Sequence, residues 1–243
     1  MVHSRIYLSV VIPAYNEENR LPSTLTETIA FLKRQKYSSE IVVVSDGSID
    51  KTKEIAERFQ ETFPELKVIE YFPNRGKGAA VKLGMKESRG DYRLFMDADM
   101  AVPVEFATKL IEIIVTRYDI VIGSRESKNS KVLKHQFFFR EFLGRLFGIV
   151  QRIVLGIPIR DTQCGFKIFE RRVAEQLFPQ VRFDCAYFDA ELLFLAHKMG
   201  LSIAEVGVSW SHDGQTRLPI GIKRTIEIIK KLFLIRYYHR ING

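Results

Sequence analysis

The chain has 243 residues, and 46% of them are hydrophobic, which is enough for one sizeable globular core. Its formal net charge of +8 is concentrated in residues 131–160 and 218–243, each of which holds six Lys and Arg against one Glu. Because these two segments carry +5 each, the rest of the chain has a net charge of −2. Neither basic segment contains a nucleic-acid reader motif, so a nucleic-acid-binding protein is not expected.

The two cysteines, Cys164 and Cys185, are too few for a disulfide framework, and their spacing fits neither a zinc ribbon nor a CxxC redox pair. A reduced environment facing the cytosol is therefore expected. The first residues show no signal-peptide cleavage pattern, and no uncharged apolar run approaches the ~18 residues that a spanning helix needs. These features predict a chain that does not cross a bilayer by itself.

Strands and helices are predicted to alternate over the first half of the chain. Apolar stretches predict strands at residues 8–12, 40–45, 66–71, 92–96 and 119–122, and the continuous runs within the first two predict burial on both faces. Helical patterns lie between them, at about residues 24–36, 50–63, 78–87 and 104–116. Thr24 and Glu27 predict a capping box for the first helix. The alternation predicts an α/β fold with a mostly parallel sheet.

The second half of the chain is less regular. Its pattern predicts a helix over about residues 136–155, a strand over 165–169, a helix over 189–199, extended chain over 203–210 and a helix over 222–238. No repeat, low-complexity tract or linker marks a domain boundary. We expect one domain over residues 1–217, followed by a basic amphipathic helix within residues 218–243.

An acidic turn, Asp97-Ala98-Asp99, follows the strand predicted at residues 92–96. In an extended chain, residues i and i+2 project to the same side, so both carboxylates can approach one hard cation. Mg²⁺ and Mn²⁺ suit such oxygen ligands, since these ions keep waters and bind substrate phosphates. A bare Asp-x-Asp is more often only a turn that closes a strand, so the prediction of a metal site depends on the neighbouring loops.

Polar residues also follow the other predicted strands, whose carboxyl ends meet at the edge where ligands bind in such sheets. Lys77 lies between glycines at a helix start, where backbone amides and the helix dipole favour anions. Arg125 offers a planar fork for phosphate, and Asp46 and Glu17 are candidates to accept hydrogen bonds from a nucleobase. The G-x-G-x-x-G and P-loop motifs are absent, which argues against hydride-transferring dinucleotide enzymes and P-loop proteins.

Five motifs carry a resemblance to a known family: VIPAYNE at residues 11–17, SDGSID at 45–50, NRGKG at 74–78, DAD at 97–99 and GSR at 123–125. In type, order and spacing they resemble the signature of family 2 glycosyltransferases, whose GT-A fold is a mixed, mostly parallel Rossmann-like sheet flanked by helices. The resemblance implies that Asp97 and Asp99 hold the metal and that Arg125 lies near the phosphates. It also implies a nucleotide-sugar donor bound by Pro13, Ala14, Tyr15, Glu17, Asp46, Gly47, Lys77, Asp97 and Ala98.

Residues 161–167, DTQCGFK, are similar to a segment of enzymes that transfer sugar to a polyprenyl phosphate, and most resemble dolichyl-phosphate β-glucosyltransferases. The resemblance implies inverting transfer of glucose from UDP-glucose to a polyprenyl (dolichyl) phosphate, with Asp99 and Arg125 stabilising the leaving diphosphate. The related mannose synthases usually carry Gln where this chain has Ala101. A GDP-mannose donor is therefore the less favoured alternative.

The acceptor side leaves two further alternatives open. A phosphate acceptor is already ionised near neutral pH and needs cations, for which Arg217 and Lys167 are the candidates. A sugar hydroxyl, as in polysaccharide synthesis, would need a carboxylate base, for which Asp189 and Glu191 are the candidates. Asp189 is equally a candidate helix N-cap. A third hypothesis is an inactive nucleotide-sugar-binding module, and the intact acidic turn argues against it.

Two basic amphipathic helices are expected to contact a membrane. In one, the apolar positions 222, 226, 229, 233 and 237 share one face and most of the Lys and Arg residues share the other. In the other, over about residues 136–155, three arginines interrupt a run rich in phenylalanine. Such helices lie on an anionic membrane surface, where each basic residue adds on the order of 1 kcal/mol. We predict a peripheral protein on the cytoplasmic face of a membrane; the alternative is that both apolar faces pack on the sheet.

Overall fold

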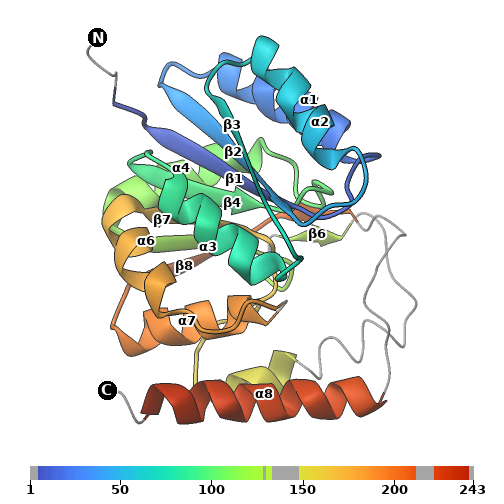
Figure 1. The fold of residues 1–243 in the computed structure, drawn as a ribbon. Helices are drawn as coiled ribbons and strands as arrows, with labels where there is room; N and C mark the ends of the chain where they lie inside the picture. Colours follow the sequence, from blue (N-terminus) through green and yellow to red (C-terminus); the bar gives the residue numbers. More distant parts are fainter. Residues whose placement is uncertain (1–4, 128–129, 133–147, 186, 212–221, 241–243) are drawn as a thin grey trace.

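The computed structural model describes residues 5–127, 130–132, 148–185, 187–211 and 222–240, without the side chains of 131–132, 222–229 and 240 (Figure 1). The strands of the main sheet are β1 (Leu8–Ala14), β2 (Ser39–Asp46), β3 (Leu66–Tyr71), β4 (Tyr92–Met96), β5 (Ile120–Ser124), β7 (Phe166–Glu170) and β8 (Ile203–Gly207). Their order is β3-β2-β1-β4-β7-β5-β8. All neighbours are parallel except those of β7, which runs antiparallel to β4 and β5. The predicted α/β fold with a mostly parallel sheet is therefore confirmed.

Helices cover both faces of this sheet. On one face lie α1 (Leu21–Lys33), α2 (Thr52–Arg58) and α4 (Phe106–Arg117); on the other lie α3 (Lys77–Glu87), α6 (Arg171–Leu177), α7 (Phe188–Lys198) and α8 (Ile222–Arg240). Residues 148–155 are also helical, and two short 3-10 helices, η1 (Phe59–Glu61) and η2 (Phe178–Gln180), follow α2 and α6. The helices bury two hydrophobic cores, one against each face of the sheet.

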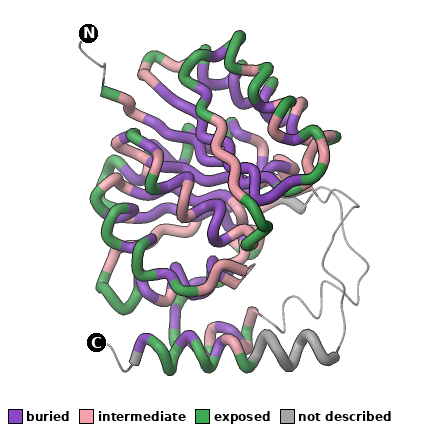
Figure 2. Tube along the Cα trace, in the orientation of Figure 1, coloured by how far each residue is buried: buried purple, intermediate pink, exposed green. Residues whose placement is uncertain are grey.

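The central strands are buried because both of their faces are covered. Every residue of β1 and β2 is buried, which explains the uninterrupted apolar runs at residues 10–12 and 41–44. In β3, at the edge of the sheet, only Leu66 is buried. Figure 2 shows this distribution, with buried positions along the strands and the exposed ones on the outer faces of the helices.

Several details differ from the sequence-based predictions. The capping box at Thr24 is wrong, because α1 begins three residues earlier, at Leu21, with Pro22 in its first turn. The Thr24 hydroxyl instead donates to the carbonyl oxygens of Arg20 (3.2 Å) and Ala98 (2.7 Å). Neither α6 nor the small sheet of β6 (Lys131–Val132) and β9 (Ser209–Trp210) was predicted. Of the helix predicted at 136–155, residues 136–147 lie outside the described residues.

The topology gathers several loops at one edge of the main sheet, which we call the rim. The six parallel strands all end there, and β7 begins there because it runs the other way. The acidic turn follows β4, and the loop that leads into β7 approaches it from the opposite direction.

Among the described residues, no helix combines the length and apolar character that crossing a bilayer requires. The division of the chain at residue 217 stays a prediction.

The core of β7 gives a test of the packing. Phe169 is fully buried, and its ring centroid lies 6.2 Å from that of Phe95 and 5.2 Å from that of Phe178. We expect Phe169→Ala to lower the free energy of unfolding by about 3–5 kcal/mol, because it removes buried surface and leaves a cavity. Urea titration followed by circular dichroism measures this change. Val115→Ala, at an exposed position of α4, is the control; an equal loss in both variants would contradict the packing described.

Candidate active site

The acidic turn is fixed by backbone contacts on both sides. The amide of Asp97 donates to the carbonyl oxygen of Gly165 at 3.1 Å, and the amide of Ala101 donates to Oδ1 of Asp99 at 3.0 Å. A Cβ at position 165 would lie 1.9 Å from Oδ2 of Asp97, so only glycine allows this approach. The turn therefore depends on the loop that leads into β7.

The two carboxylates of the acidic turn fit a divalent cation. Burial and the neighbouring charge of Asp97 raise the pKa of Asp99, and a cation between the two groups would relieve that repulsion. The Asp97 side chain keeps 35% of its surface exposed, so it is open to a ligand. The described part of the chain holds no cluster of three or more His, Cys, Asp or Glu suited to a metal. A Mg²⁺ or Mn²⁺ ion at this turn would thus take its remaining ligands from water and phosphate, as these ions commonly do.

Lys77 reaches the acidic turn from the first residue of α3. Its Nζ lies 2.5 Å from Oδ1 of Asp97 and 3.8 Å from Oδ2 of Asp189. Burial alone would lower the pKa of Lys77, but these two carboxylates raise it, so the side chain carries a full positive charge. The structure thus brings a cation and the acidic turn together; a phosphate site here stays a prediction.

The start of α3 differs in one respect from the predicted anion site. Its Gly78 amide does not face the rim, because it donates to the carbonyl oxygen of Asp184 at 2.8 Å. The preceding Gly76 adopts a φ of 105°, which favours glycine. At this turn the Lys77 side chain, rather than the Gly78 amide, is therefore the group offered to an anion.

Lys167 and Asp189 form a buried pair behind Lys77. Lys167 is 0% exposed, and its Nζ contacts Oδ1 of Asp189 and the carbonyl oxygen of Cys164. Asp189 is 2% exposed and lies in the first turn of α7, where Tyr187 occupies the N-cap position, so the prediction of an Asp189 N-cap is wrong. Lys167 has no surface from which to grip an acceptor phosphate in this state. Its ammonium instead neutralises a buried carboxylate.

Glu191 lies on the same helix but faces away from the acidic turn. Its carboxylate accepts hydrogen bonds from the amides of Arg182 (3.0 Å) and Phe183 (2.8 Å). Its Oε1 also lies 2.6 Å from Nε2 of His239 in α8. Nothing in the sequence spacing indicated this arrangement, since Glu191 and His239 are 48 residues apart. Elsewhere in the site, burial raises the pKa of the Cys164 thiol, beside Lys167, to about 12, so that thiol is neutral and packs in the core.

The loops after β2 and β3 stand beside each other on the rim. Both oxygens of Asp46 accept hydrogen bonds from the loop before α3, from the amides of Arg75 (2.7 Å) and Gly76 (2.8 Å) and from Nδ2 of Asn74 (2.9 Å). Gly47, with a φ of +67°, packs against this loop, since a Cβ there would lie 2.5 Å from the Asn74 nitrogen. Asp46 therefore shapes the rim through the loop that carries Lys77.

The predicted donor residues after β1 occupy different environments. Pro13 and Ala14 are buried within the strand, while Tyr15 just beyond it is exposed. Glu17 forms a two-pronged ion pair with Arg20, in which both N···O distances are 2.6 Å. The role of these residues in binding a nucleobase stays a prediction.

Arg125 is held rigidly at the end of β5. Its guanidinium makes a two-pronged ion pair with Asp161, at 2.7 and 2.8 Å, and lies 5.4 Å from the ring centroid of Trp210. Burial alone would raise the pKa of Asp161, but Arg125 outweighs it and keeps that carboxyl ionised. Arg217 and the neighbouring His212 lie outside the described residues. Ser211, just before them, donates its amide to the carbonyl oxygen of Ala101 at 3.0 Å, beside the acidic turn.

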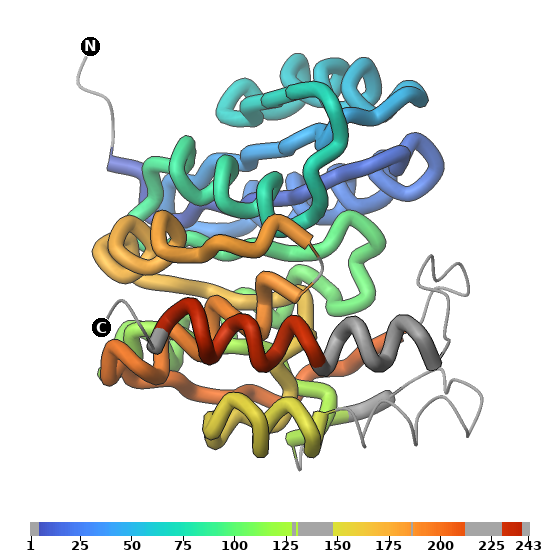
Figure 3. The backbone as a smooth tube through the Cα atoms, turned by 60° about the horizontal axis from the view of Figure 1, so that its bottom comes forward, coloured from blue at the N-terminus to red at the C-terminus, as the bar shows by residue number. Residues whose placement is uncertain are grey.

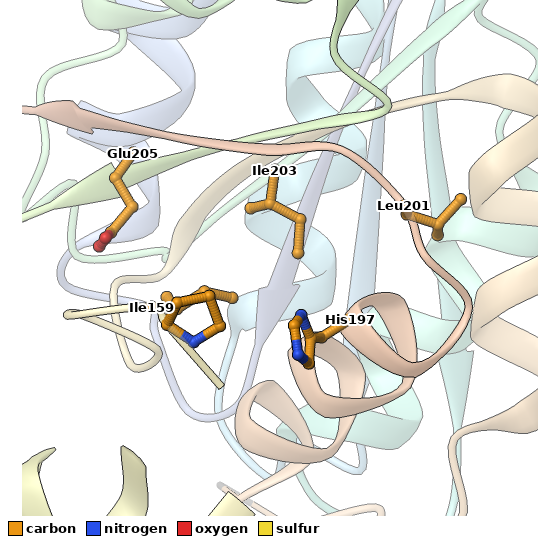
Figure 4. Close-up of a pocket in the computed structure, with 6 residues that line it drawn as sticks. Ile159, His197, Leu201, Ile203 and Glu205 are labelled. Atoms are coloured by element: carbon orange, nitrogen blue, oxygen red, sulfur yellow. The ribbon is translucent and has the colours of Figure 1, made fainter. Parts of the chain in front are cut away.

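A pocket of about 200 Å³ lies away from these residues, at the edge of the sheet next to β8 (Figure 4). It is lined by Pro158, Ile159, His197, Leu201, Ile203 and Glu205. None of the residues predicted to bind the donor or the metal lines it. We therefore do not assign the donor site to this pocket.

Comparison with known proteins identifies the family. The model of glycosyl transferase family 2 matches residues 9–178. The dolichyl-phosphate beta-glucosyltransferase of Dictyostelium discoideum is 38% identical over 250 residues, covering 98% of this chain and 76% of that protein. The protein of the same name from Homo sapiens is 35% identical over 243 residues, covering 94% of this chain and 74% of its own length.

Solved structures share the fold at lower sequence identity. Glucosyl-3-phosphoglycerate synthase from Mycobacterium tuberculosis in complex with UDP has a TM-score of 0.67 at 21% identity, with 95% of this chain and 80% of that chain covered. Mannosyl-3-phosphoglycerate synthase from Rubrobacter xylanophilus has a TM-score of 0.71 at 18% identity, with 98% and 76% covered. Another structure of the mycobacterial enzyme contains Mn²⁺, UDP and glucosyl-3-phosphoglycerate, with a TM-score of 0.64 at 21% identity and 94% and 77% covered. This chain therefore belongs to glycosyl transferase family 2 and has the GT-A fold, with the acidic turn at the rim of its sheet.

Proposed function

We propose that this glycosyltransferase moves glucose from UDP-glucose to a polyprenyl phosphate of the dolichyl type, with inversion at the anomeric carbon. The observation that carries the proposal is the convergence of Lys77 with the carboxylate of Asp97 on the rim, at an Nζ···Oδ1 distance of 2.5 Å. The names of relatives that are 35% and 38% identical over nearly the whole chain support the choice of sugar and acceptor.

On the donor side, Asp97 and Asp99 would hold Mg²⁺ or Mn²⁺. The bound ion would supply positive charge to the diphosphate as it leaves. Lys77 shares Asp97 with that ion, so we propose that its ammonium turns from Asp97 toward the diphosphate when the donor binds. Arg125 is held in place by Asp161 and Trp210, and it would add a second cation to the rim, one that does not have to move.

On the acceptor side, an oxygen of the lipid phosphate would attack the anomeric carbon while the bond from that carbon to the diphosphate oxygen breaks. The phosphate is already ionised, so no residue has to remove a proton. We propose that Arg217 holds this phosphate; Ser211, six residues before it in the sequence, contacts Ala101 beside the acidic turn.

The surroundings of the two candidate bases favour this acceptor over a sugar hydroxyl. The Asp189 carboxylate is buried and contacts Lys167, with Lys77 3.8 Å away, while both oxygens of Glu191 are engaged in hydrogen bonds away from the acidic turn. A general base must reach the proton that it removes. Neither carboxylate is placed to do so, which weakens the polysaccharide-forming alternative.

We also propose that one face of the protein rests on an anionic membrane. Figures 1 and 3 show helical residues 148–155 beside α8, and Arg236 of α8 donates to the carbonyl oxygen of Val154 at 3.0 Å. Large apolar side chains of these helices are exposed: Ile153 by 73%, Phe233 by 58% and Tyr237 by 59%. Leu232 and Ile235 bury the other side of α8 in the core. Exposed apolar residues beside arginines and lysines are typical of interfacial helices.

The metal assignment can be tested on the acidic turn. We expect Asp97→Asn and Asp99→Asn each to lower kcat/KM at least about a hundredfold, because each removes a carboxylate from the cation. The assay is organic extraction of label after incubation with radiolabelled UDP-glucose and dolichyl phosphate, with and without EDTA. GDP-mannose is the competing donor in the same assay. Full activity in EDTA or in either variant would contradict the assignment.

A catalytic role of Asp189 can be tested separately from its role in stability. Asp189→Asn alone should lower the free energy of unfolding by about 3–5 kcal/mol, because Lys167 loses its buried partner. The double variant Lys167→Met/Asp189→Asn should recover most of this loss. Because we propose no catalytic base, the double variant should keep kcat within about tenfold, whereas loss of a base costs roughly 10²–10⁴-fold. A loss of that size in a stably folded double variant would favour the hydroxyl acceptor.

Membrane binding can be tested by flotation with vesicles that contain anionic phospholipid. We expect Ile153→Glu and Tyr237→Glu each to weaken binding roughly tenfold, because a charge replaces an apolar side chain that enters the interface. Val115→Glu, also at an exposed apolar position but on α4, is the matched control and should bind as the wild type does. Equal binding by all four proteins would contradict the proposed face.

A further inference from the structure

Residues 181–185, which we call the connector, fix the loop that carries Lys77. The carbonyl oxygen of Asp184 accepts the Gly78 amide at 2.8 Å, and its carboxylate pairs with Lys82 at 2.5 Å and with Arg75 at 3.1 Å. A Cβ at Gly76 would lie 2.5 Å from the same carbonyl oxygen. Any shift of the connector must therefore move the start of α3 with it.

The other side of the connector is tied to α8 through one buried carboxylate. Glu191 accepts the amides of Arg182 and Phe183 and lies 2.6 Å from Nε2 of His239. His239 is itself buried, and the carbonyl oxygen of this residue accepts a hydrogen bond from Lys198. The ring of Tyr238 adds contacts to the same two residues of the connector. Its centroid lies 6.3 Å from that of the Phe183 ring and 5.8 Å from the guanidinium carbon of Arg182.

We propose that Glu191 and His239 are positioning residues, which hold α8 against the connector and thereby set the place of Lys77 for the donor diphosphate. The contacts of both residues described above are with the connector, α8 and α7, and the transfer reaction proposed above uses neither of them. The path runs from His239 to Glu191, to the connector amides, to Asp184 and then to the start of α3. The identity of the ligand, a nucleoside diphosphate, rests on the proposed function.

The test uses the full chain and three variants, His239→Ala, Glu191→Gln and His239→Gln. Titration calorimetry gives the Kd for UDP with Mn²⁺, initial rates give KM and kcat, and hydrogen exchange reports on residues 76–80 without ligand. In His239→Ala and Glu191→Gln we expect Kd and KM to rise roughly tenfold while kcat stays within about threefold, because donor binding and not the chemistry is affected. Exchange at residues 76–80 should become faster in both.

His239→Gln should restore the wild-type values to within about threefold, since its amide can donate to Glu191 as the imidazole nitrogen does. His197→Gln, at an exposed position of α7, is the control and should change nothing. A lower melting temperature in His239→Ala with unchanged Kd for UDP and unchanged exchange at residues 76–80 would overturn the inference, as would failure of His239→Gln to rescue.

The two proposals fail in different ways. If the wild-type protein binds no UDP, the proposed function fails, and the exchange measurement on the ligand-free protein still decides whether α8 controls the start of α3. If UDP binds and both variants bind it as tightly as the wild type, the inference fails and the proposed function stands.

Discussion

A balanced set of buried charges underlies this site. Lys167, with no exposed surface, contacts Asp189, and Lys77 lies between Asp189 and Asp97. An isolated charge in such a place would be costly, so each of these groups depends on its neighbour. The series ends at Asp97, where the side chain meets solvent. The arrangement therefore places one carboxylate and one cation, Asp97 and Lys77, at the surface in front of a buried ion pair.

The sequence was a good guide to whatever depends on local pattern. Apolar stretches located five strands within one or two residues of their observed bounds. The two central strands β1 and β2, covered on both faces, show no alternation. Parallel pairing then implied that the polar residues after those strands lie on one edge, and the structure places Asp46, Lys77, Asp97 and Arg125 there. Short motifs in a fixed order were enough to identify the family.

Pairs between side chains that are far apart in the sequence leave no local pattern from which they could be predicted. Arg125 and Asp161 are 36 residues apart, and Glu191 and His239 are 48 apart, so no helical or strand period relates them. The same limit explains why Lys167 was expected on the surface and Asp189 at a helix cap. Both are polar by type, yet their mutual contact lets them be buried. Burial of a charged residue is decided by its partner, which only the folded chain reveals.

The reversed direction of β7 decides which parts of the chain meet at the acidic turn. The segments that follow β1, β2 and β4 carry the groups proposed to bind the nucleotide sugar. The segment before β7 reaches the same rim from the second half of the chain, because β7 runs antiparallel to β4. Gly165 brings that incoming segment against Asp97 with no side chain between them. A single inverted strand thus brings a segment from the second half of the chain into direct contact with a turn from the first half, at one edge of one sheet.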